Sequence, residues 1–130
     1  MAGTLAEWIE GYRVAWENRD PEAAAGLFTP DATYRSNIVE PAHQGQEGVR
    51  AYWESVTASQ NDIQVRMGRP FVDGTRVTVE FWTTMTVDGD AVTLPGCLLL
   101  DFTDDWQCRR LREYWHFIPG HHEPPEEWGQ

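Results

Sequence analysis

Glu113 is the residue of this sequence whose surroundings most favour chemistry. It lies in a strand-like segment near the end of the chain, between Leu111 and Trp115. Alternate side chains of a strand point to the same face, so Glu113 shares its face with these two apolar residues. A carboxyl group among apolar neighbours has a raised pKa, because burial disfavours its charged form. We therefore interpret Glu113 as a candidate general acid or base.

Three further residues could assist Glu113 in catalysis. The hydroxyls of Tyr12 and Tyr34 could donate hydrogen bonds to a ligand carbonyl, and His43 could shuttle protons because imidazole titrates near neutral pH. Each of these four residues could instead have a structural role. Glu113 could be a buried hydrogen-bond partner of Tyr12 or Tyr34, or face solvent at a pocket mouth. The tyrosines could be core residues, and His43 a surface or capping residue.

The first part of the sequence predicts three helices. Five apolar residues recur at helical spacing and predict an amphipathic first helix: Leu5, Trp8, Ile9, Tyr12 and Trp16. Asp20 is typical of an N-cap and Pro21 of a first helical position, so a second helix is expected over 21–28, and Pro30 is expected to close it. A third helix is expected over 46–58, after a loop over 38–45.

The remaining segments predict strands. One is expected over 32–37, and from Ile63 onward the period changes to two. Strands are expected over 63–72, 76–87, 91–102 and 108–118, with hairpin signals at Asp73-Gly74 and Asp88-Gly89. This order predicts an α+β domain over 1–118, in which helices cover one face of a mostly antiparallel sheet, and an extended tail over 119–130.

Composition narrows the classes of function. The net charge of −11 argues against nucleic acid and against an anionic membrane surface. The two cysteines form no CxxC pair, and no apolar run reaches membrane-spanning length, so a cytoplasmic protein with free thiols is expected. No phosphate-binding or dinucleotide glycine motif is present, and His116, His121 and His122 match no zinc spacing. We expect neither a cofactor nor a metal.

Several spaced motifs resemble the nuclear transport factor two-like superfamily, and within it the SnoaL-like group. They are Asp20-Pro21-Glu22-Ala23, Leu27-Phe28 with Asp31-Ala32-Thr33-Tyr34, the run from Gly45 to Trp53, and Arg112-Glu113-Tyr114-Trp115. The resemblance covers residues 5–118. It implies a cone-shaped, strongly curved sheet wrapped around the helices, an internal pocket and often a homodimer, but no single chemistry.

The resemblance also allows the catalytic patterns of two members to be compared. Tyr12 and Asp20 repeat a spacing of ketosteroid isomerases, but Ser36 and Leu98 stand where those enzymes need carboxyl groups, so we expect no steroid isomerase activity. Limonene epoxide hydrolases hold a water with an Asp and an Arg, where this chain has Phe81 and Thr83. Tyr34 matches their tyrosine and Ser36, imperfectly, their asparagine, while Glu113 remains as a carboxylate.

By this alignment the pocket is lined by mostly apolar side chains: Trp16, Phe28, Tyr34, Ser36, Trp53, Phe81, Thr83, Leu98, Leu100, Leu111 and Trp115. Three hypotheses follow. The pocket binds a small apolar or aromatic molecule; or the chain is a cofactor-free acid–base enzyme that uses Glu113; or it is an association module whose own side chains fill the pocket. Trp82 is expected to face outward, covered by a second copy in a homodimer or by the tail with Trp128.

Overall fold

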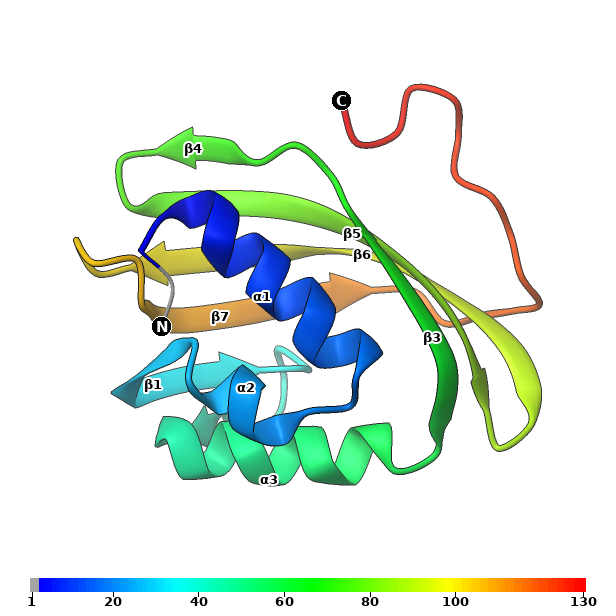
Figure 1. The fold of residues 1–130 in the computed structure, drawn as a ribbon, viewed down its shortest axis with the longest axis horizontal. Coiled ribbons are helices and arrows are strands. Elements are labelled where there is room, and N and C mark those ends of the chain that lie inside the picture. Colours follow the sequence, from blue (N-terminus) through cyan, green and yellow to red (C-terminus); the bar gives the residue numbers. More distant parts are fainter. Residues whose placement is uncertain (1–2) are drawn as a thin grey trace.

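The computed structural model describes residues 3–130 and has the expected α+β architecture. Helices α1 (Leu5–Glu17), α2 (Pro21–Ala25) and α3 (Gly45–Thr57) lie on one face of a curved eight-stranded sheet (Figure 1). The strands are β1 (Phe28–Arg35), β2 (His43–Gln44), β3 (Gln60–Met67), β4 (Phe71–Asp73), β5 (Arg76–Val87), β6 (Asp90–Phe102), β7 (Cys108–Trp115) and β8 (Ile118–Pro119).

The sheet places strand β1, from the first part of the chain, beside strand β7, from the last part. Its order is β2-β1-β7-β6-β5-β3, with β4 paired to β5 and β8 paired to β6. Only the pairing of β1 with β7 is parallel among the pairs of residues 3–130, and it sets Tyr34 opposite Leu111. The long β5–β6 hairpin turns at Asp88 and Gly89, whose φ angles of 51° and 88° suit the turn that the sequence predicts.

Local chemistry explains where the first two helices begin. The Thr4 side chain accepts a hydrogen bond from the Glu7 N–H at the start of α1, and Asp20 accepts one from the Ala23 N–H at the start of α2. Helix α1 buries the face that carries Trp8, Tyr12, Ala15 and Trp16. Its amphipathic pattern is therefore confirmed.

Several predicted boundaries are wrong. Helix α2 ends at Ala25, not at residue 28, because Phe28 already pairs with Cys108 as the first residue of β1. Pro30 does not close a helix but lies in an irregular part of β1, where the loss of its N–H is tolerated. The strand expected over 63–72 is divided into β3 and β4 by residues 68–70, and the last long strand ends at Trp115. The expected loop over 38–45 contains β2.

The C-terminal tail packs on the outer face of the sheet, away from the helices. The Trp82 indole N–H donates a 2.9 Å hydrogen bond to the His122 carbonyl, and the Trp82 and Trp128 rings meet edge to face at 5.9 Å. The Arg66 guanidinium lies over the Trp128 ring. The tail thus covers Trp82, which is one of the two covers expected from the sequence. The homodimer stays a prediction.

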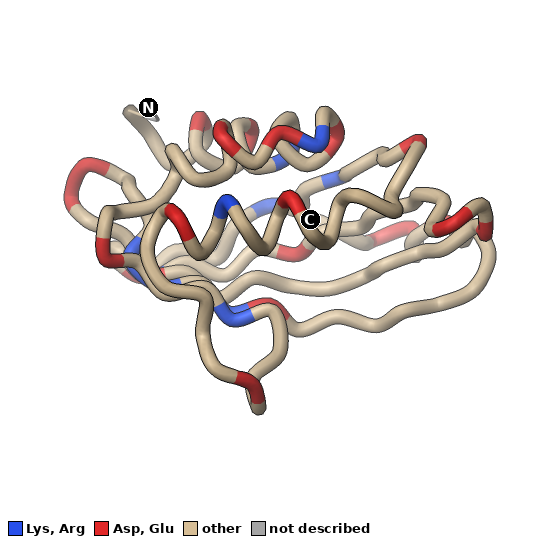
Figure 2. The backbone as a smooth tube through the Cα atoms, turned by 90° about the horizontal axis from the view of Figure 1, so that it is seen from below, with Lys and Arg blue, Asp and Glu red and all other residues tan. Residues whose placement is uncertain are grey.

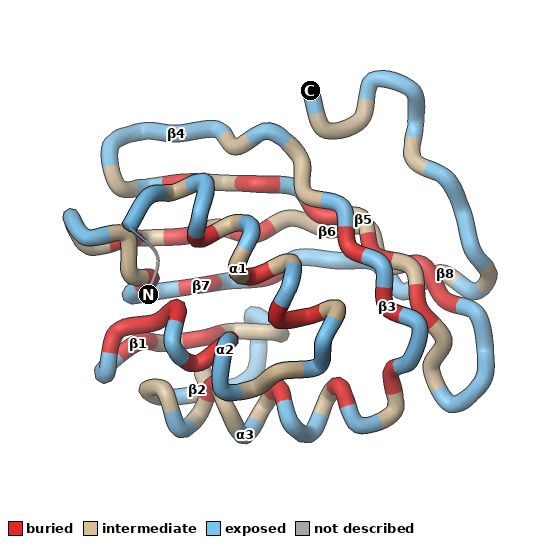
Figure 3. Tube along the Cα trace, viewed as in Figure 1, coloured by how far each residue is buried: buried red, intermediate tan, exposed pale blue. Residues whose placement is uncertain are grey.

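The core lies where the helices meet the sheet. Buried segments of α1, β5, β6 and β7 face one another across this boundary (Figure 3). Trp8 is fully buried, with ring centroids 5.1 Å from Phe102 and 6.0 Å from Phe28, so aromatic rings fill one end of the cone. Acidic residues spread over both layers (Figure 2). No helix within residues 3–130 is long and apolar enough to cross a membrane.

Candidate functional site

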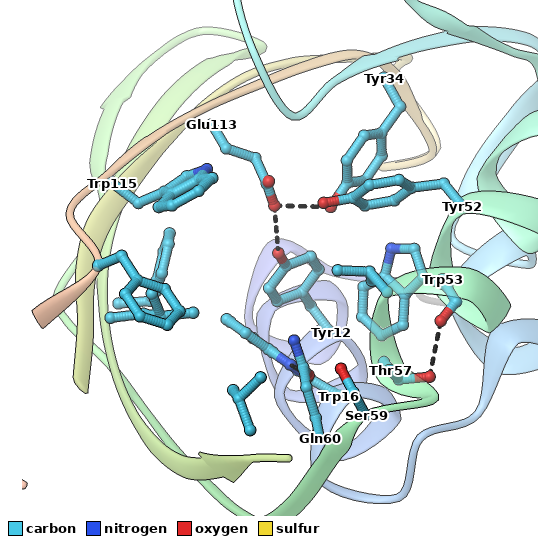
Figure 4. Close-up of a pocket in the computed structure, with 15 residues that line it drawn as sticks. Tyr12, Trp16, Tyr34, Tyr52, Trp53, Thr57, Ser59, Gln60, Glu113 and Trp115 are labelled. Atoms are coloured by element: carbon cyan, nitrogen blue, oxygen red, sulfur yellow. Dashed lines mark hydrogen bonds between the residues drawn. The ribbon is translucent and has the colours of Figure 1, made fainter. Parts of the chain in front are cut away.

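Glu113 lies on the inner face of β7, as the alternation predicts, and is 9% exposed. One carboxylate oxygen, Oε2, accepts hydrogen bonds from two tyrosines (Figure 4). The Tyr34 hydroxyl of β1 donates at 2.7 Å and the Tyr12 hydroxyl of α1 at 3.3 Å. Three elements that are distant in sequence therefore meet at this one carboxylate.

The other carboxylate oxygen of Glu113 is free for a ligand. Oε1 accepts no hydrogen bond from residues 3–130, and the side chain borders a cavity. Burial raises the pKa of Glu113 to about 7, although the hydrogen bonds from Tyr34 and then Tyr12 act in the opposite direction. Near neutral pH the carboxyl is therefore present in both protonation states, which is the requirement for a general acid or base.

The tyrosine hydroxyls around Glu113 remain protonated. Burial raises the pKa of Tyr12, Tyr34 and Tyr52 above the ordinary tyrosine value, and the nearby charge of Glu113 raises each of them further. At neutral pH the proton that this cluster can lose is consequently the one on Glu113.

The cavity beside Glu113 has a volume of about 200 Å³. An apolar cavity of about 150 Å³ holds benzene, whereas pockets for drug-sized ligands begin near 300 Å³, so this space suits a molecule of about one ring. Its lining comes from α1, β1, α3, the turn after α3, β3, β5, β6, β7 and the segment after β7: Tyr12, Trp16, Tyr34, Tyr52, Trp53, Val56, Thr57, Ser59, Gln60, Phe81, Val87, Leu94, Glu113, Trp115 and Phe117.

The candidate catalytic residues Tyr12 and Glu113 border the cavity, and so does part of the predicted lining: Trp16, Tyr34, Trp53, Phe81 and Trp115. Phe28, Thr83, Leu98, Leu100 and Leu111 are also buried, but they belong to the core and not to the cavity wall. The reason is that aromatic rings such as Trp8 and Phe102 already fill the space beside the core residues at that end of the cone.

His43 lies outside the cavity. Its ring stacks on Tyr52 with centroids 4.5 Å apart, on the side of a surface groove that also contains Glu47 and Arg50. The His43 ring also lies 6.2 Å from the Tyr34 ring, so both of its aromatic neighbours separate it from the cavity. His43 packs against Tyr52 from behind, and Tyr52 itself borders the cavity.

Ser36 contributes to the cavity mouth through its backbone. Its carbonyl accepts a 3.1 Å hydrogen bond from the Trp115 indole N–H, while Ser36 itself does not line the cavity. Trp115 is 44% exposed and Phe117 is 56% exposed, so these two rings stand at the opening of the cavity.

The sequence analysis did not assign several cavity residues: Tyr52, Val56, Thr57, Ser59, Gln60, Val87, Leu94 and Phe117. Tyr52 and Val56 lie on the apolar face of α3, so helical periodicity could have indicated them. Gln60 carries no such signal. Its amide oxygen accepts a 3.0 Å hydrogen bond from the Trp16 indole N–H, which holds a polar group at the cavity wall.

Within residues 3–130 no group of three or more His, Cys, Asp or Glu side chains could hold a metal ion. The His121 ring contacts the Met85 carbonyl and the His122 ring the Pro119 carbonyl, each at 2.9 Å. The His121 ring thus contributes to the docking of the tail on β5, whereas the His122 ring contact lies within the C-terminal segment itself.

Residues 9–110 match the model of the SnoaL-like domain, so the chain belongs to this family. The family lies within the nuclear transport factor two-like superfamily, as the sequence motifs indicated. Glu113 and the tail lie beyond the matched residues. A comparison with curated proteins finds no match.

Solved structures share the fold at low sequence identity. A protein of ketosteroid isomerase-like fold from Catenulispora acidiphila, in complex with trimethylamine, is 21% identical with a TM-score of 0.76 over 85% of this chain and 86% of that one. The epoxide hydrolase/cyclase-like enzyme SalBIII is 19% identical with a TM-score of 0.76 over 88% and 94%. A limonene epoxide hydrolase-like enzyme from Mycobacterium tuberculosis is 17% identical with a TM-score of 0.68 over 84% and 80%.

Proposed function

We propose that this SnoaL-like domain binds a small molecule with an apolar or aromatic body in the cavity, and that Glu113 contacts the polar group of that molecule. The observation that carries the proposal is a buried carboxylate at the wall of a cavity, with one oxygen held by two tyrosines and no hydrogen bond from residues 3–130 to the other. Fixed hydrogen bonds on one side leave the other side in a defined orientation for a ligand.

Two further observations support ligand binding. The cavity volume of about 200 Å³ counts against the association module, since that hypothesis requires a cone filled by its own side chains. Among the structural neighbours, the Catenulispora protein holds trimethylamine and SalBIII takes part in pyran ring formation, so proteins of this fold do bind or convert small molecules.

A second candidate function is a cofactor-free acid–base enzyme. The pKa of about 7 at Glu113 favours it, because the same group could donate a proton to a ligand oxygen or accept one from a carbon or a water. The reaction would be an isomerisation, cyclisation, dehydration or hydrolysis. Tyr12 and Tyr34 would then hold the carboxylate in position through both protonation states.

Native mass spectrometry of the protein purified from its source tests the binding proposal. We expect a bound molecule of about one ring, whose loss on replacement of the cavity residue Phe81 by Trp would assign it to this site. The exposed substitution Val14→Trp is the matched control and should retain the molecule. A molecule retained in the Phe81→Trp variant would contradict the proposal.

Glu113→Gln separates binding from catalysis once that molecule is known. The amide keeps the shape and can still accept hydrogen bonds from both tyrosines, but it does not titrate. An enzyme should lose turnover and keep most of its binding, whereas a binding protein should change only in affinity. Turnover that survives in the variant would exclude Glu113 as the acid or base.

A further inference from the structure

Aromatic rings form most of the wall around Glu113. Eight of the fifteen residues that line the cavity are aromatic: Tyr12, Trp16, Tyr34, Tyr52, Trp53, Phe81, Trp115 and Phe117. Figure 4 shows Trp115, Tyr52 and Tyr12 on different sides of the carboxylate. The face of an aromatic ring is electronegative and attracts a cation that lies over it.

Glu113 is the one charged side chain among the lining residues, and the cavity offers it no cation. Its hydrogen bonds come from neutral hydroxyls, while the salt bridges described within residues 3–130 involve Arg13, Arg50, Arg76 and Arg110 with other acids. An ionised carboxylate that is buried without an opposite charge is destabilised. A ligand that brought a positive charge would remove this cost.

We propose that the cavity takes a small organic cation, an alkylammonium or trimethylammonium compound, with its positive nitrogen against Oε1 of Glu113 and within the aromatic wall. The proposal rests on the proposed function, because it names the class of ligand for the same site. A neutral apolar ligand would satisfy the rings but leave the carboxylate without a partner. A cation satisfies both parts of the site.

The rest of the cavity sets the size and polarity of the body that carries the charge. The volume of about 200 Å³ admits about one ring or a short branched chain. Ser59 and Gln60 lie across the cavity from Glu113 (Figure 4). Their hydroxyl and amide groups can bind a ligand hydroxyl. An amino alcohol such as choline therefore has the features that the cavity matches.

The proposal has a defined pH dependence. The groups that face Glu113 are the hydroxyls of Tyr12 from α1, Tyr34 from β1 and Tyr52 from α3, and all three remain protonated because their pKa values are raised. A cation binds the ionised form of Glu113. Its affinity should rise about tenfold per pH unit below the carboxyl pKa and become constant above it.

Isothermal titration with choline and with its neutral isostere, in which a tert-butyl group replaces the trimethylammonium group, tests the proposal. Near pH 8 we expect choline to bind about tenfold tighter or more, since a desolvated cation–π contact alone contributes on that scale. The isostere should show no rise in affinity with pH. Equal or weaker binding of choline, or no binding of either probe at millimolar concentration, overturns the proposal.

Variants separate the site from the general attraction of an acidic protein for cations. Glu113→Gln should remove the preference for choline over the isostere, while Glu54→Gln, which removes one exposed negative charge outside the cavity, should keep it. Trp115→Leu, at the exposed mouth, should weaken choline severalfold and leave the isostere unchanged. A preference retained in both Glu113→Gln and Trp115→Leu contradicts the proposal.

The outcome also separates this proposal from the proposed function. If the isostere binds as well as choline and the Phe81→Trp variant loses it, the cavity is a binding site for neutral molecules and only the cation proposal fails. If Phe81→Trp binds either probe as well as the unchanged protein does, the cavity is not the site and both proposals fail.

Discussion

The Tyr34 hydroxyl donates a 2.7 Å hydrogen bond to Oε2 of Glu113, although the two residues are 79 positions apart in the chain. The parallel pairing of β1 with β7 produces this contact, because it aligns Tyr34 with Leu111 and so brings the Tyr34 ring beside the next inward residue of β7. The hydrogen bond favours the ionised form of Glu113 in a site where burial favours the neutral form.

Removing the Tyr34 hydroxyl should raise the pKa of Glu113. In Tyr34→Phe the carboxylate loses its shorter hydrogen bond, so we expect the pKa to increase from about 7. The increase should be about one pH unit, the effect of one hydrogen bond to a charged group. Tyr12→Phe removes the 3.3 Å hydrogen bond and should cause a smaller increase. Carbon-13 NMR of the glutamate carboxyl measures both values, and a lower pKa in Tyr34→Phe would contradict this assignment.

Glu113 should make the protein less stable as the pH rises from about 4.5 to about 7. Its folded-state pKa of about 7 lies above the ordinary value of 4.5, so the folded state binds this proton more tightly than the unfolded state does. The stabilisation is complete below about pH 4.5 and is lost as the pH approaches about 7.

Glu113→Gln lacks this titration, so the difference in the free energy of unfolding between the variant and the unchanged protein should depend on pH. Between about pH 4 and about pH 8 this difference should shift in favour of the variant by on the order of 2–3 kcal/mol. Urea denaturation at the two pH values measures the change, and Glu54→Gln is the exposed control. A difference that does not vary with pH would show that Glu113 keeps an ordinary pKa.

Gly96 is required by close packing against Phe81 and β7. A Cβ atom at this position would lie 2.5 Å from the Tyr114 carbonyl oxygen and 2.6 Å from the Phe81 ring. Gly96→Ala should therefore lower the free energy of unfolding by about 1–3 kcal/mol through overpacking. Gly26→Ala is the control, because its Cβ would lie 3.6 Å from the nearest atoms. Equal stability of the two variants in thermal unfolding would refute the packing argument.

Trp128 should hold the tail on the outer face of the sheet. Trp128→Ala removes the contacts with Trp82 and Arg66, and we expect a loss of about 1–2 kcal/mol in stability. Limited proteolysis should then cut the tail faster. The substitution Glu127→Ala, at the neighbouring exposed residue, should change neither property. An unchanged cleavage rate in Trp128→Ala would mean that other contacts hold the tail.

The proposed homodimer would use the part of the outer face that the tail leaves free. Tyr114 is 42% exposed there, beside Cys97 on β6. We expect the unchanged protein to sediment as a dimer at micromolar concentration and Tyr114→Glu to sediment as a monomer, because the substitution places a charge within an apolar contact. A monomer in the unchanged protein counts against the proposal.

The sequence predicts the carboxylate more reliably than the cavity around it. Glu113 could be placed because a period of two depends only on local strand geometry, and Leu111 shares its face. The same pattern also selected Leu98 and Leu100, which are inward but lie where the cone is filled. Periodicity says which side of a strand faces inward, but it does not say how far along the cone the side chains fill the space.

Local sequence patterns could not predict the cavity residues that lie at the ends of helices and strands. Ser59 and Gln60 lie just after α3 and at the start of β3, and only the packing of α1 against β3 brings them to the cavity. The end of α2 was predicted too late for a related reason. Pro30 usually marks the end of a regular element, but here it lies in an irregular part of β1 that accommodates it. In each case a tertiary contact decided what the local sequence left open.

The parallel pairing of β1 with β7 also affects the order in which the protein can form. During synthesis β1 emerges early, but its neighbour β7 follows only after most of the chain has been made. Contacts of such long sequence separation slow folding, because a large loop must close before they contribute. Until then β1, with its buried residues Phe28, Ala32 and Tyr34, pairs only with the short β2, and the edge that pairs with β7 is open. A nascent chain that stalls before β7 would present this apolar strand to chaperones or to other chains.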